Sequence, residues 1–163
     1  MSAQTPAASQ IPVRTVEQRA FVGLIRAYAA TTRRLSADLE SDHGLTLSDY
    51  EVLLHLAHAP DRRMRRIDLS RSVLLTPSGI TRLLEGLERN GFVERGKCES
   101  DARVSYALLT QRGHAKLREA SETHLEDIRA HFAERFAEEE LDALGELLAR
   151  LELESPESPD CSL

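Results

Sequence analysis

Apolar residues recur at helical spacing near the start of the chain. Over residues 16–40 they return every three or four positions, the period of an amphipathic helix. Gly44 then supplies a stop signal. Thr46 and Ser48 each have an acidic residue three positions later, which gives two overlapping capping-box starts for a second helix. This second helix, residues 47–58, is apolar on several sides, so we expect it to lie at the centre of the fold.

The middle of the chain predicts a short helix, a turn and a longer helix. A break at Pro60 precedes the short helical stretch, which covers about residues 67–73. Thr76 and Pro77 predict the next start, because threonine caps free backbone N–H groups and proline at the first helical position has no N–H to leave unpaired. The longer helix should run to about Asn90, where Asn90-Gly91 supplies a left-handed stop. Its apolar stripe consists of Ile80, Leu83, Leu84 and Leu87.

The pattern then changes from a helical period to a period of two. Residues 92–97 and 104–109 are short β-like runs, and a polar loop at residues 98–103 separates them. Two such runs around a short polar loop are typical of a β-hairpin. We therefore predict a hairpin with charged side chains at its tip.

Two further helices complete the pattern. Thr110 can cap a long helix, and three glutamates stand at the positive end of a final one. The long helix carries Leu117, Leu125, Ile128, Phe132 and Phe136, and the final one carries Leu141, Leu144, Leu148 and Leu151 on one face. We expect a disordered N-terminal arm at residues 1–15 and a disordered acidic tail at residues 154–163. The predicted fold class is mainly α, with a small β-hairpin.

Composition bounds the function classes. The chain has 163 residues, of which 41% are hydrophobic, which suits one domain, or one domain with a dimerisation extension. It has no apolar run of about 18 residues, so we exclude a membrane span, and residues 1–10 do not resemble a secretion signal. Two cysteines cannot form a disulfide framework. We therefore expect a reducing, cytoplasmic environment.

Charge is distributed unevenly along the chain. The net charge of −6 by itself argues against a nucleic-acid binder. Residues 61–118, however, hold thirteen Lys and Arg against seven Asp and Glu, a net +6, whereas residues 119–163 hold three against fourteen, a net −11. Such a basic segment indicates either a solvated surface or a surface that meets a polyanion. The candidate phosphate contacts are Arg65, Arg66, Arg71 and Arg89.

The order of elements in the basic segment indicates a winged helix-turn-helix. A short helix, a turn and a second helix match that motif, in which the second helix enters the DNA major groove, and the hairpin adds a wing. The start of the second helix is rich in small or hydrogen-bonding side chains, and arginine can pair bidentately with guanine. The candidate residues there are Thr76, Pro77, Ser78, Gly79, Thr81 and Arg82. At the wing tip, Arg103 is a candidate for a narrow minor groove, with Asp101 holding it in place.

At this point residues from about 17 to 152 resemble the MarR family of winged helix-turn-helix transcriptional regulators. Four stretches carry the resemblance: LTLS with YEVL at residues 45–53, TPSGITRLLEGLERNGFVER at 76–95, the pair Asp101-x-Arg103, and LTQRG at 109–113. One departure is Ala137, where a capping serine or threonine is common in the family.

The resemblance implies a homodimer that binds a palindromic DNA operator and regulates transcription, as a repressor rather than an activator. In the family the helix matching residues 77–90 reads the major groove, the arginine matching Arg103 reaches the minor groove, and the first, fifth and sixth helices interlock. We expect a dimerisation helix at 16–44, a DNA-binding domain at 45–110 and dimerisation helices at 111–153. Long helices with one apolar face also need a partner to cover them.

The family further implies a small-molecule effector, most often a phenolic or other aromatic anion. Tyr28 and Tyr50 are candidate contacts for it, although a tyrosine on an apolar helix face also suits a core. We expect no cofactor and no metal site, because the histidine pairs lack nearby cysteine or well-spaced carboxylates. Cys98 beside Lys97 is interpreted as a structural thiol rather than a redox sensor.

Enzymes form the competing class of function. The sequence contains no GxSxG, GxGxxG or P-loop motif and no nucleophile at a supporting distance from a base, so we predict a protein that is not an enzyme. The remaining alternative is a winged-helix module that binds a protein without specific DNA binding. The salt dependence of affinity distinguishes DNA binding from protein binding, because an interface with about six or more phosphate contacts weakens steeply as salt rises.

Overall fold

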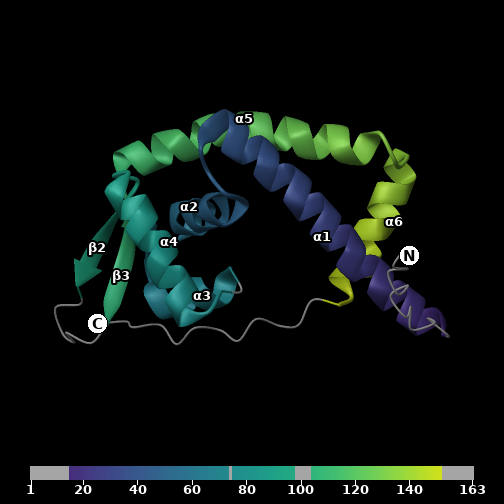
Figure 1. The fold of residues 1–163 in the computed structure, drawn as a ribbon, viewed down its shortest axis with the longest axis horizontal. Helices are drawn as coiled ribbons and strands as arrows, with labels where there is room; N and C mark the ends of the chain where they lie inside the picture. Colours follow the sequence, from purple (N-terminus) through teal and green to yellow (C-terminus); the bar gives the residue numbers. More distant parts are fainter. Residues whose placement is uncertain (1–14, 74, 98–103, 152–163) are drawn as a thin grey trace, which may run out of the picture. The chain divides into compact units, whose positions relative to one another are not determined.

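The computed structural model describes residues 15–73, 75–97 and 104–151, which form mostly helices with one small sheet (Figure 1). The elements in chain order are α1 (Val16–His43), α2 (Leu47–His58), the 3-10 helix η1 (Pro60–Arg62), β1 (Arg63–Arg65), α3 (Arg66–Ser72), α4 (Pro77–Arg89), β2 (Val93–Lys97), β3 (Ser105–Leu109), α5 (Gln111–Ala133) and α6 (Glu138–Ala149). The chain divides into two compact units, and the boundary between Arg34 and Leu35 falls within α1.

The first unit consists of the N-terminal part of α1. Thr15 and Gln18 start the helix reciprocally, since Thr15 Oγ1 accepts from the Gln18 N–H and Gln18 Oε1 accepts from the Thr15 N–H, each at 3.2 Å. The apolar stripe predicted for this helix is exposed here: Phe21 is 66% exposed and Tyr28 is 65% exposed. The described part of this unit therefore presents an uncovered apolar face.

The second unit begins with the end of α1 and the start of α2. α1 continues to His43, three residues beyond the predicted range, and Gly44 follows with a φ of +65°. Of the two candidate caps for α2, Thr46 is the one used: its Oγ1 accepts from the Asp49 N–H at 3.1 Å, and Asp49 Oδ2 accepts from the Thr46 N–H at 3.0 Å. The predicted capping box is thus confirmed at Thr46.

The predicted short and long helices of the basic segment are confirmed as α3 and α4. Thr76 Oγ1 accepts from the Gly79 N–H at 3.1 Å, and Pro77 is the first helical residue. At the other end, the Phe92 N–H bonds to the Leu87 carbonyl at 2.9 Å while Gly91 takes a φ of +71°. Both boundaries of α4 follow from these local bonds.

A sheet of three antiparallel strands in the order β1-β3-β2 adjoins these helices. The predicted hairpin is confirmed, with Val93 opposite Leu109 and Lys97 opposite Ser105. The sequence did not predict β1, whose Arg63 lies opposite Leu108. This strand is only three residues long and carries two arginines, so it has neither the length nor the alternation that reveals a strand in a sequence.

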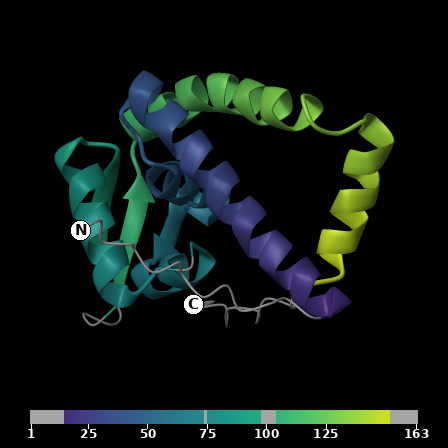
Figure 2. The same ribbon diagram turned by 45° about the vertical axis from the view of Figure 1, so that its right-hand side comes forward.

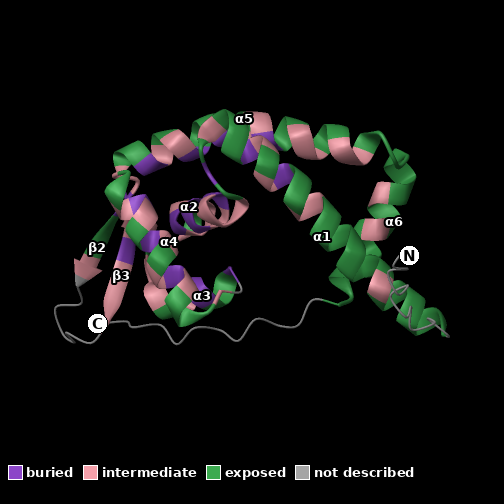
Figure 3. Ribbon diagram, viewed as in Figure 1, coloured by how far each residue is buried: buried purple, intermediate pink, exposed green. Residues whose placement is uncertain are grey.

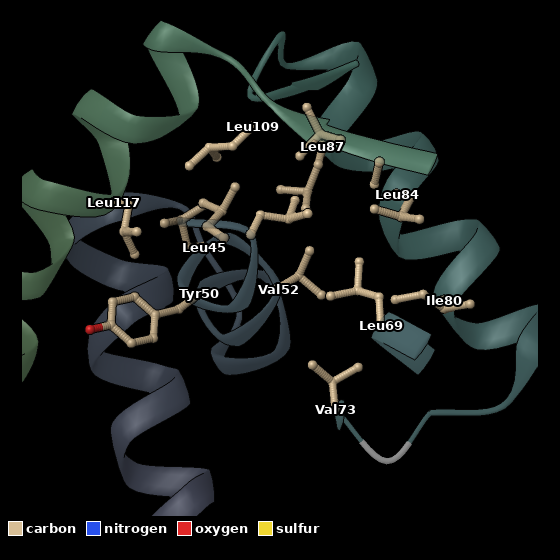
Figure 4. Packing of buried hydrophobic residues seen from close by; sticks show 14 of the residues in the cluster. Leu45, Tyr50, Val52, Leu69, Val73, Ile80, Leu84, Leu87, Leu109 and Leu117 are labelled. Atoms are coloured by element: carbon tan, nitrogen blue, oxygen red, sulfur yellow. The ribbon is translucent and has the colours of Figure 1, made fainter. Parts of the chain in front are cut away.

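The core of the second unit lies where α2, α3, α4, β3 and the start of α5 meet. Figure 3 shows the buried residues concentrated on these elements, and Figure 4 shows their side chains pointing toward one another. The buried cluster consists of Leu39, Leu45, Tyr50, Val52, Leu53, Leu56, Leu69, Val73, Ile80, Leu84, Leu87, Val93, Ala107, Leu109, Leu117 and Ala120. As predicted, α2 is central, because it contributes the fully buried Val52, Leu53 and Leu56.

The last two helices follow the sheet, and α5 leads from β3 to α6 (Figure 2). Thr110 caps α5 as predicted, since its Oγ1 accepts from the Gly113 N–H at 3.0 Å. Phe136 and Leu151, which were predicted to lie within these helices, follow the ends of α5 and α6. Phe136 lies outside both helices because α6 starts anew after Ala137. Glu140 Oε2 accepts from the Ala137 N–H at 2.9 Å, and Ala137 itself supplies no side-chain cap.

Candidate nucleic-acid interface

α4 has one face in the core and the opposite face toward solvent. Ile80, Leu84 and Leu87 are buried, and the predicted Leu83 is half-buried beside them. The exposed side chains recur with the same helical spacing, at Ser78, Arg82, Glu85 and Arg89. The helix is therefore fixed by its apolar face and leaves a polar stripe for a ligand.

The first turn of α4 is shaped by the Thr76 cap. Ser78 Oγ lies 3.2 Å from Thr76 Oγ1, so the two exposed hydroxyls are hydrogen-bonded to each other. A Cβ on Gly79 would lie 3.2 Å from Thr76 Oγ1, which is tighter than an ordinary contact. Gly79 thus has a structural reason to be glycine, in addition to the close approach to phosphate expected from the sequence.

The next residues of α4 differ in which of their polar groups remain available to a ligand. Thr81 Oγ1 donates to the Pro77 carbonyl at 2.8 Å, so its hydroxyl hydrogen is used within the helix, while its oxygen lone pairs and methyl group stay available. Arg82 is exposed, and no hydrogen bond or ion pair joins it to any residue in the described ranges. Its guanidinium can therefore meet an acceptor on a ligand without breaking such a contact.

The candidate phosphate contacts occupy different environments. Arg65 and Arg66 are half-buried at the junction of β1 and α3, and Arg66 Nη2 is buried without a hydrogen-bond partner among the described residues. Arg71 and Arg89 are exposed. Arg71 Nη1 lies 3.8 Å from Asp68 Oδ1, a surface ion pair of a kind that contributes little to stability.

A shallow groove lies between α3 and the start of α4, and the sequence did not predict it. Its volume is about 250 Å³. Ile67, which is 47% exposed although it is a large apolar residue, forms part of the wall. The residues that line the groove are Arg66, Ile67, Ser70, Pro77, Ile80 and Thr81.

The base of the wing is tied to the helices. Arg95 of β2 makes two hydrogen bonds to the Glu88 carboxylate of α4, from Nε and Nη2, both at 3.3 Å. The guanidinium of Arg63 stacks over the Tyr106 ring, 4.5 Å from its centroid. The predicted tip residues Asp101 and Arg103, together with Cys98 in the same loop, lie outside the described residues.

The two candidate effector contacts are placed differently. Tyr28 is exposed on α1, whereas Tyr50 is only 7% exposed in the core. Ser121 Oγ donates to the Leu117 carbonyl at 2.7 Å, so the Tyr50 hydroxyl is the donor to Ser121 Oγ at 3.1 Å. The Tyr50 ring also meets the His124 ring edge to face, with 4.7 Å between centroids.

His124 is a buried titratable group on α5 beside this tyrosine. Burial lowers the pKa of His124, because desolvation penalises the imidazolium, and the charge of Asp127 partly opposes the effect. Its Nδ1 is buried without a hydrogen-bond partner in the described part of the chain. We therefore treat His124 as neutral near pH 7.

The described residues offer neither a metal site nor a membrane span. No group of three or more His, Cys, Asp or Glu in the described ranges is arranged to hold a metal ion. Among the described helices, none combines the length and apolar character needed to cross a membrane.

Comparison with known proteins points to one family. A model of the MarR family matches residues 43–104, which include α2, α3, α4 and β2 and end just before β3. The chain is also similar to the HTH-type transcriptional repressor YetL of Bacillus subtilis (strain 168), with 35% identity over 112 residues that cover 66% of each protein.

Solved structures share the same arrangement over most of the chain. Sco3205, a MarR family transcriptional regulator from Streptomyces coelicolor in complex with DNA, matches with a TM-score of 0.76 and 30% identity, covering 85% of this chain and 90% of that one. AbsC, a MarR family transcriptional regulator from the same organism, matches with a TM-score of 0.73 and 30% identity, covering 90% of this chain and 95% of that one.

Proposed function

This chain belongs to the MarR family of transcriptional regulators, and from that premise we propose that it binds a palindromic DNA operator through α4 and represses transcription. The observation that carries the proposal is the first part of α4. Its cap, Thr76, fixes the turn, its apolar face anchors the helix in the core, and its exposed face presents small polar side chains with Arg82. Major-groove recognition requires these features of a helix.

The proposed contacts form two groups, those to the bases of the duplex and those to its phosphates. Side chains at the start of α4 would face base edges, and arginines around it would neutralise phosphates. The proposed base contacts are Ser78, Thr81 and Arg82, with Thr76, Pro77 and Gly79 shaping the turn, and the proposed phosphate contacts are Arg65, Arg66, Arg71 and Arg89. In the wing, Arg103 is proposed to enter the minor groove with Asp101 orienting it.

We propose that the working unit is a homodimer. Large apolar side chains are exposed in both units, among them Phe21 in the first and Leu125 and Leu147 in the second. Single scattered apolar residues are ordinary on a surface, but runs of them along helices mark an interface. A two-fold dimer also accounts for a palindromic operator, because each half-site then meets one α4.

The proposal includes release by a small aromatic or phenolic effector, with Tyr28 and Tyr50 as candidate contacts. A direct check is calorimetric titration of the protein with a simple phenolic acid, followed by the same titration of Tyr50→Phe. Loss of the Tyr50 hydroxyl removes its bond to Ser121 and should weaken binding if that hydroxyl contacts the effector. Equal affinity in both proteins would remove Tyr50 from the proposed contacts.

The mode of action that we propose is binding rather than catalysis. The family consists of transcriptional regulators, and the DNA face described above supplies binding groups only. We further propose that the protein acts in the cytoplasm, since the relatives named above come from bacteria, whose chromosomes lie there.

Selection of bound duplexes from a random-sequence library tests the proposed function. The full-length protein should enrich a palindrome with half-sites whose centres lie about 10 base pairs apart, or a multiple of that spacing. The same selection with Arg82→Ala should enrich the palindrome less sharply at one position of each half-site. A library that stays random after several rounds would contradict sequence-specific DNA binding.

A further inference from the structure

The groove between α3 and α4 is lined by the apolar residues Ile67, Pro77 and Ile80 together with Arg66, Ser70 and Thr81. Both isoleucines line the groove, but Ile80 is buried in the core whereas Ile67 remains 47% exposed. The groove belongs to the second unit throughout, so its geometry depends on one compact body. An exposed isoleucine beside a groove of about 250 Å³ gives this part of the surface an apolar contact area of its own.

The two hydroxyl groups that line the groove use their hydrogens within their own helices. Ser70 Oγ donates to the Ile67 carbonyl at 2.7 Å, and Thr81 Oγ1 donates to the Pro77 carbonyl at 2.8 Å. Each hydroxyl has a single hydrogen, so neither can donate to a ligand without giving up its helix bond. Arg66 is then the one lining side chain with a buried donor that lacks a partner in the described ranges, and the rest of the lining suits an apolar group.

Charge around the groove indicates what carries that apolar group. Arg66 lines the groove with a buried Nη2 that lacks a partner in the described ranges, and Arg82, the residue after Thr81, is exposed. Arg71 on α3 is exposed as well, with its Nη1 3.8 Å from Asp68 Oδ1, and it does not line the groove. A partner that places a small apolar group between cations must itself be anionic close to that group. Double-stranded DNA has both the negative charge and the apolar group, since thymine displays a 5-methyl group in the major groove between the phosphate strands.

We infer that the groove formed by Ile67, Pro77, Ile80 and Thr81 receives the 5-methyl group of a thymine in each operator half-site. The inference rests on the proposed DNA-binding function, and it adds a specificity determinant, Ile67, that lies outside α4. Pro77 and Thr81 belong to the N-terminal part of α4, which faces base edges in a helix-turn-helix. Ile67 is carried by α3 and reaches the same groove from the other side.

The inference is tested with a duplex that carries the consensus selected by the wild-type protein. Each thymine in turn is replaced by deoxyuridine, which lacks only the 5-methyl group, and the dissociation constant of the full-length protein is measured by fluorescence anisotropy at fixed salt. One thymine per half-site should stand out, with binding weakened about fourfold by one replacement and about sixteenfold by both, the effect of one buried methyl group per half-site.

Ile67→Ala supplies the decisive comparison. This variant should bind the thymine duplex more weakly than the wild type and should lose most of its sensitivity to deoxyuridine at the same position, to less than about twofold. Arg82→Ala is the matched control, because it should weaken binding to both duplexes and keep the fourfold ratio between them. Ile67→Val retains most of the side chain and should give an intermediate ratio, so the comparison survives if Ile67→Ala folds poorly.

Two results would overturn the inference while leaving DNA binding intact. One is a wild-type protein that is indifferent to deoxyuridine at every position, and the other is an Ile67→Ala variant that keeps the full fourfold sensitivity. In the first case the groove takes a different occupant, and in the second the methyl group is read elsewhere. Failure of the selection to enrich any duplex would instead contradict the proposed function.

Discussion

Single side chains at the start of α4 divide into those that build the helix and those left for a ligand. Thr76 and Gly79 form the cap, and the Thr81 hydroxyl returns to the Pro77 carbonyl. Arg82 remains exposed, with no bond to the described residues. Arg82 should therefore contribute most of the binding free energy of base recognition, since arginine offers two parallel donors to guanine.

Replacing Arg82 by alanine should cost about 1–3 kcal/mol of binding free energy on the selected operator and relax base preference at one position. Fluorescence anisotropy on the operator and on its single-base variants measures both effects. Glu85→Ala, on the same exposed face, is the control, because removal of an acidic group near phosphates should leave affinity equal or higher. Unchanged affinity in Arg82→Ala would remove this residue from the interface.

A second residue-scale prediction concerns Gly113 at the start of α5. A Cβ there would overlap the Phe92 carbonyl oxygen and lie 2.8 Å from Leu109 Cδ1, so Gly113→Ala should lower the free energy of unfolding by at least about 1–3 kcal/mol. Urea titration followed by circular dichroism measures this. Gly86→Ala in α4, where the nearest atom to an added Cβ is Arg89 Nη2 at 3.8 Å, should instead raise stability by about 0.5–1 kcal/mol. Equal stability of the two variants would contradict the tight packing at Gly113.

Among the elements, α4 and α5 are joined through a short shared segment. Gly91 and Phe92 follow α4, and Thr110 Oγ1 donates to the Gly91 carbonyl at 2.7 Å while the Thr110 N–H donates to the Phe92 carbonyl at 3.1 Å. The same Thr110 caps α5. The start of α5 and the segment that follows α4 are thus held together by hydrogen bonds from one residue.

The contact of α2 with α5 carries a pH-dependent prediction. Burial holds the pKa of His124 below its ordinary value of 6.5, so the unfolded chain binds this proton more readily than the folded chain. The contribution of a neutral His124 to stability is therefore present above about pH 6.5 and is lost as pH falls below it. Urea unfolding at pH 7.5 and pH 5.5 should show a smaller decrease on acidification for His124→Gln than for the wild type. Identical decreases would show that His124 does not titrate in this way.

The elements also show which parts of the fold a sequence can predict. Both ends of α2 and α4 and the start of α5 depend on bonds within a few residues, such as the Thr76 cap, and the sequence predicts these correctly. β1 becomes a strand only by pairing with β3, more than forty residues later, so its own three residues carry no signal. Phe136 fits the apolar spacing of α5, but it lies beyond that helix, because the Glu140 carboxylate bonds to the Ala137 N–H and a new helix begins there.

The candidate site also has one part that the sequence predicts and one part that it does not. The capped start of α4 was predicted, because both its cap and its exposed face follow from the spacing of residues on one helix. The groove was not predicted, because it requires Ile67 of α3 and Thr81 of α4 to be brought together by packing of Leu69 and Ile80 in the core. In a sequence, Ile67 is simply an apolar residue in a short helix.

For the whole molecule, the exposed apolar residues predict that the dimer depends on α6. Leu148 is 40% exposed, and Leu148→Gln should weaken dimerisation by about tenfold or more, since each two-fold dimer loses two apolar contacts. Sedimentation equilibrium measures the dimer dissociation constant. Glu146→Gln, an exposed substitution two residues earlier, should leave it unchanged. Equal dissociation constants for the two variants would place the interface elsewhere.

Charge is also a property of the whole molecule. The net −6 combines a net +6 over residues 61–118, where thirteen basic residues oppose seven acidic ones, with acidic helices that follow. A duplex should therefore be attracted to the segment that contains α3 and α4 and repelled by the remainder. This distribution favours binding in one orientation and makes binding sensitive to salt.

The salt dependence of operator binding tests the central claim, DNA recognition by α4 and its surrounding arginines, most directly. Affinity for the selected duplex is measured by anisotropy over a range of salt concentrations, with a scrambled duplex in parallel. With about eight phosphate contacts, four from each protomer, the logarithm of the association constant should fall against the logarithm of salt concentration with a slope of about −7, and the selected duplex should bind more tightly throughout. A slope near zero, or equal affinity for the two duplexes, would contradict the account.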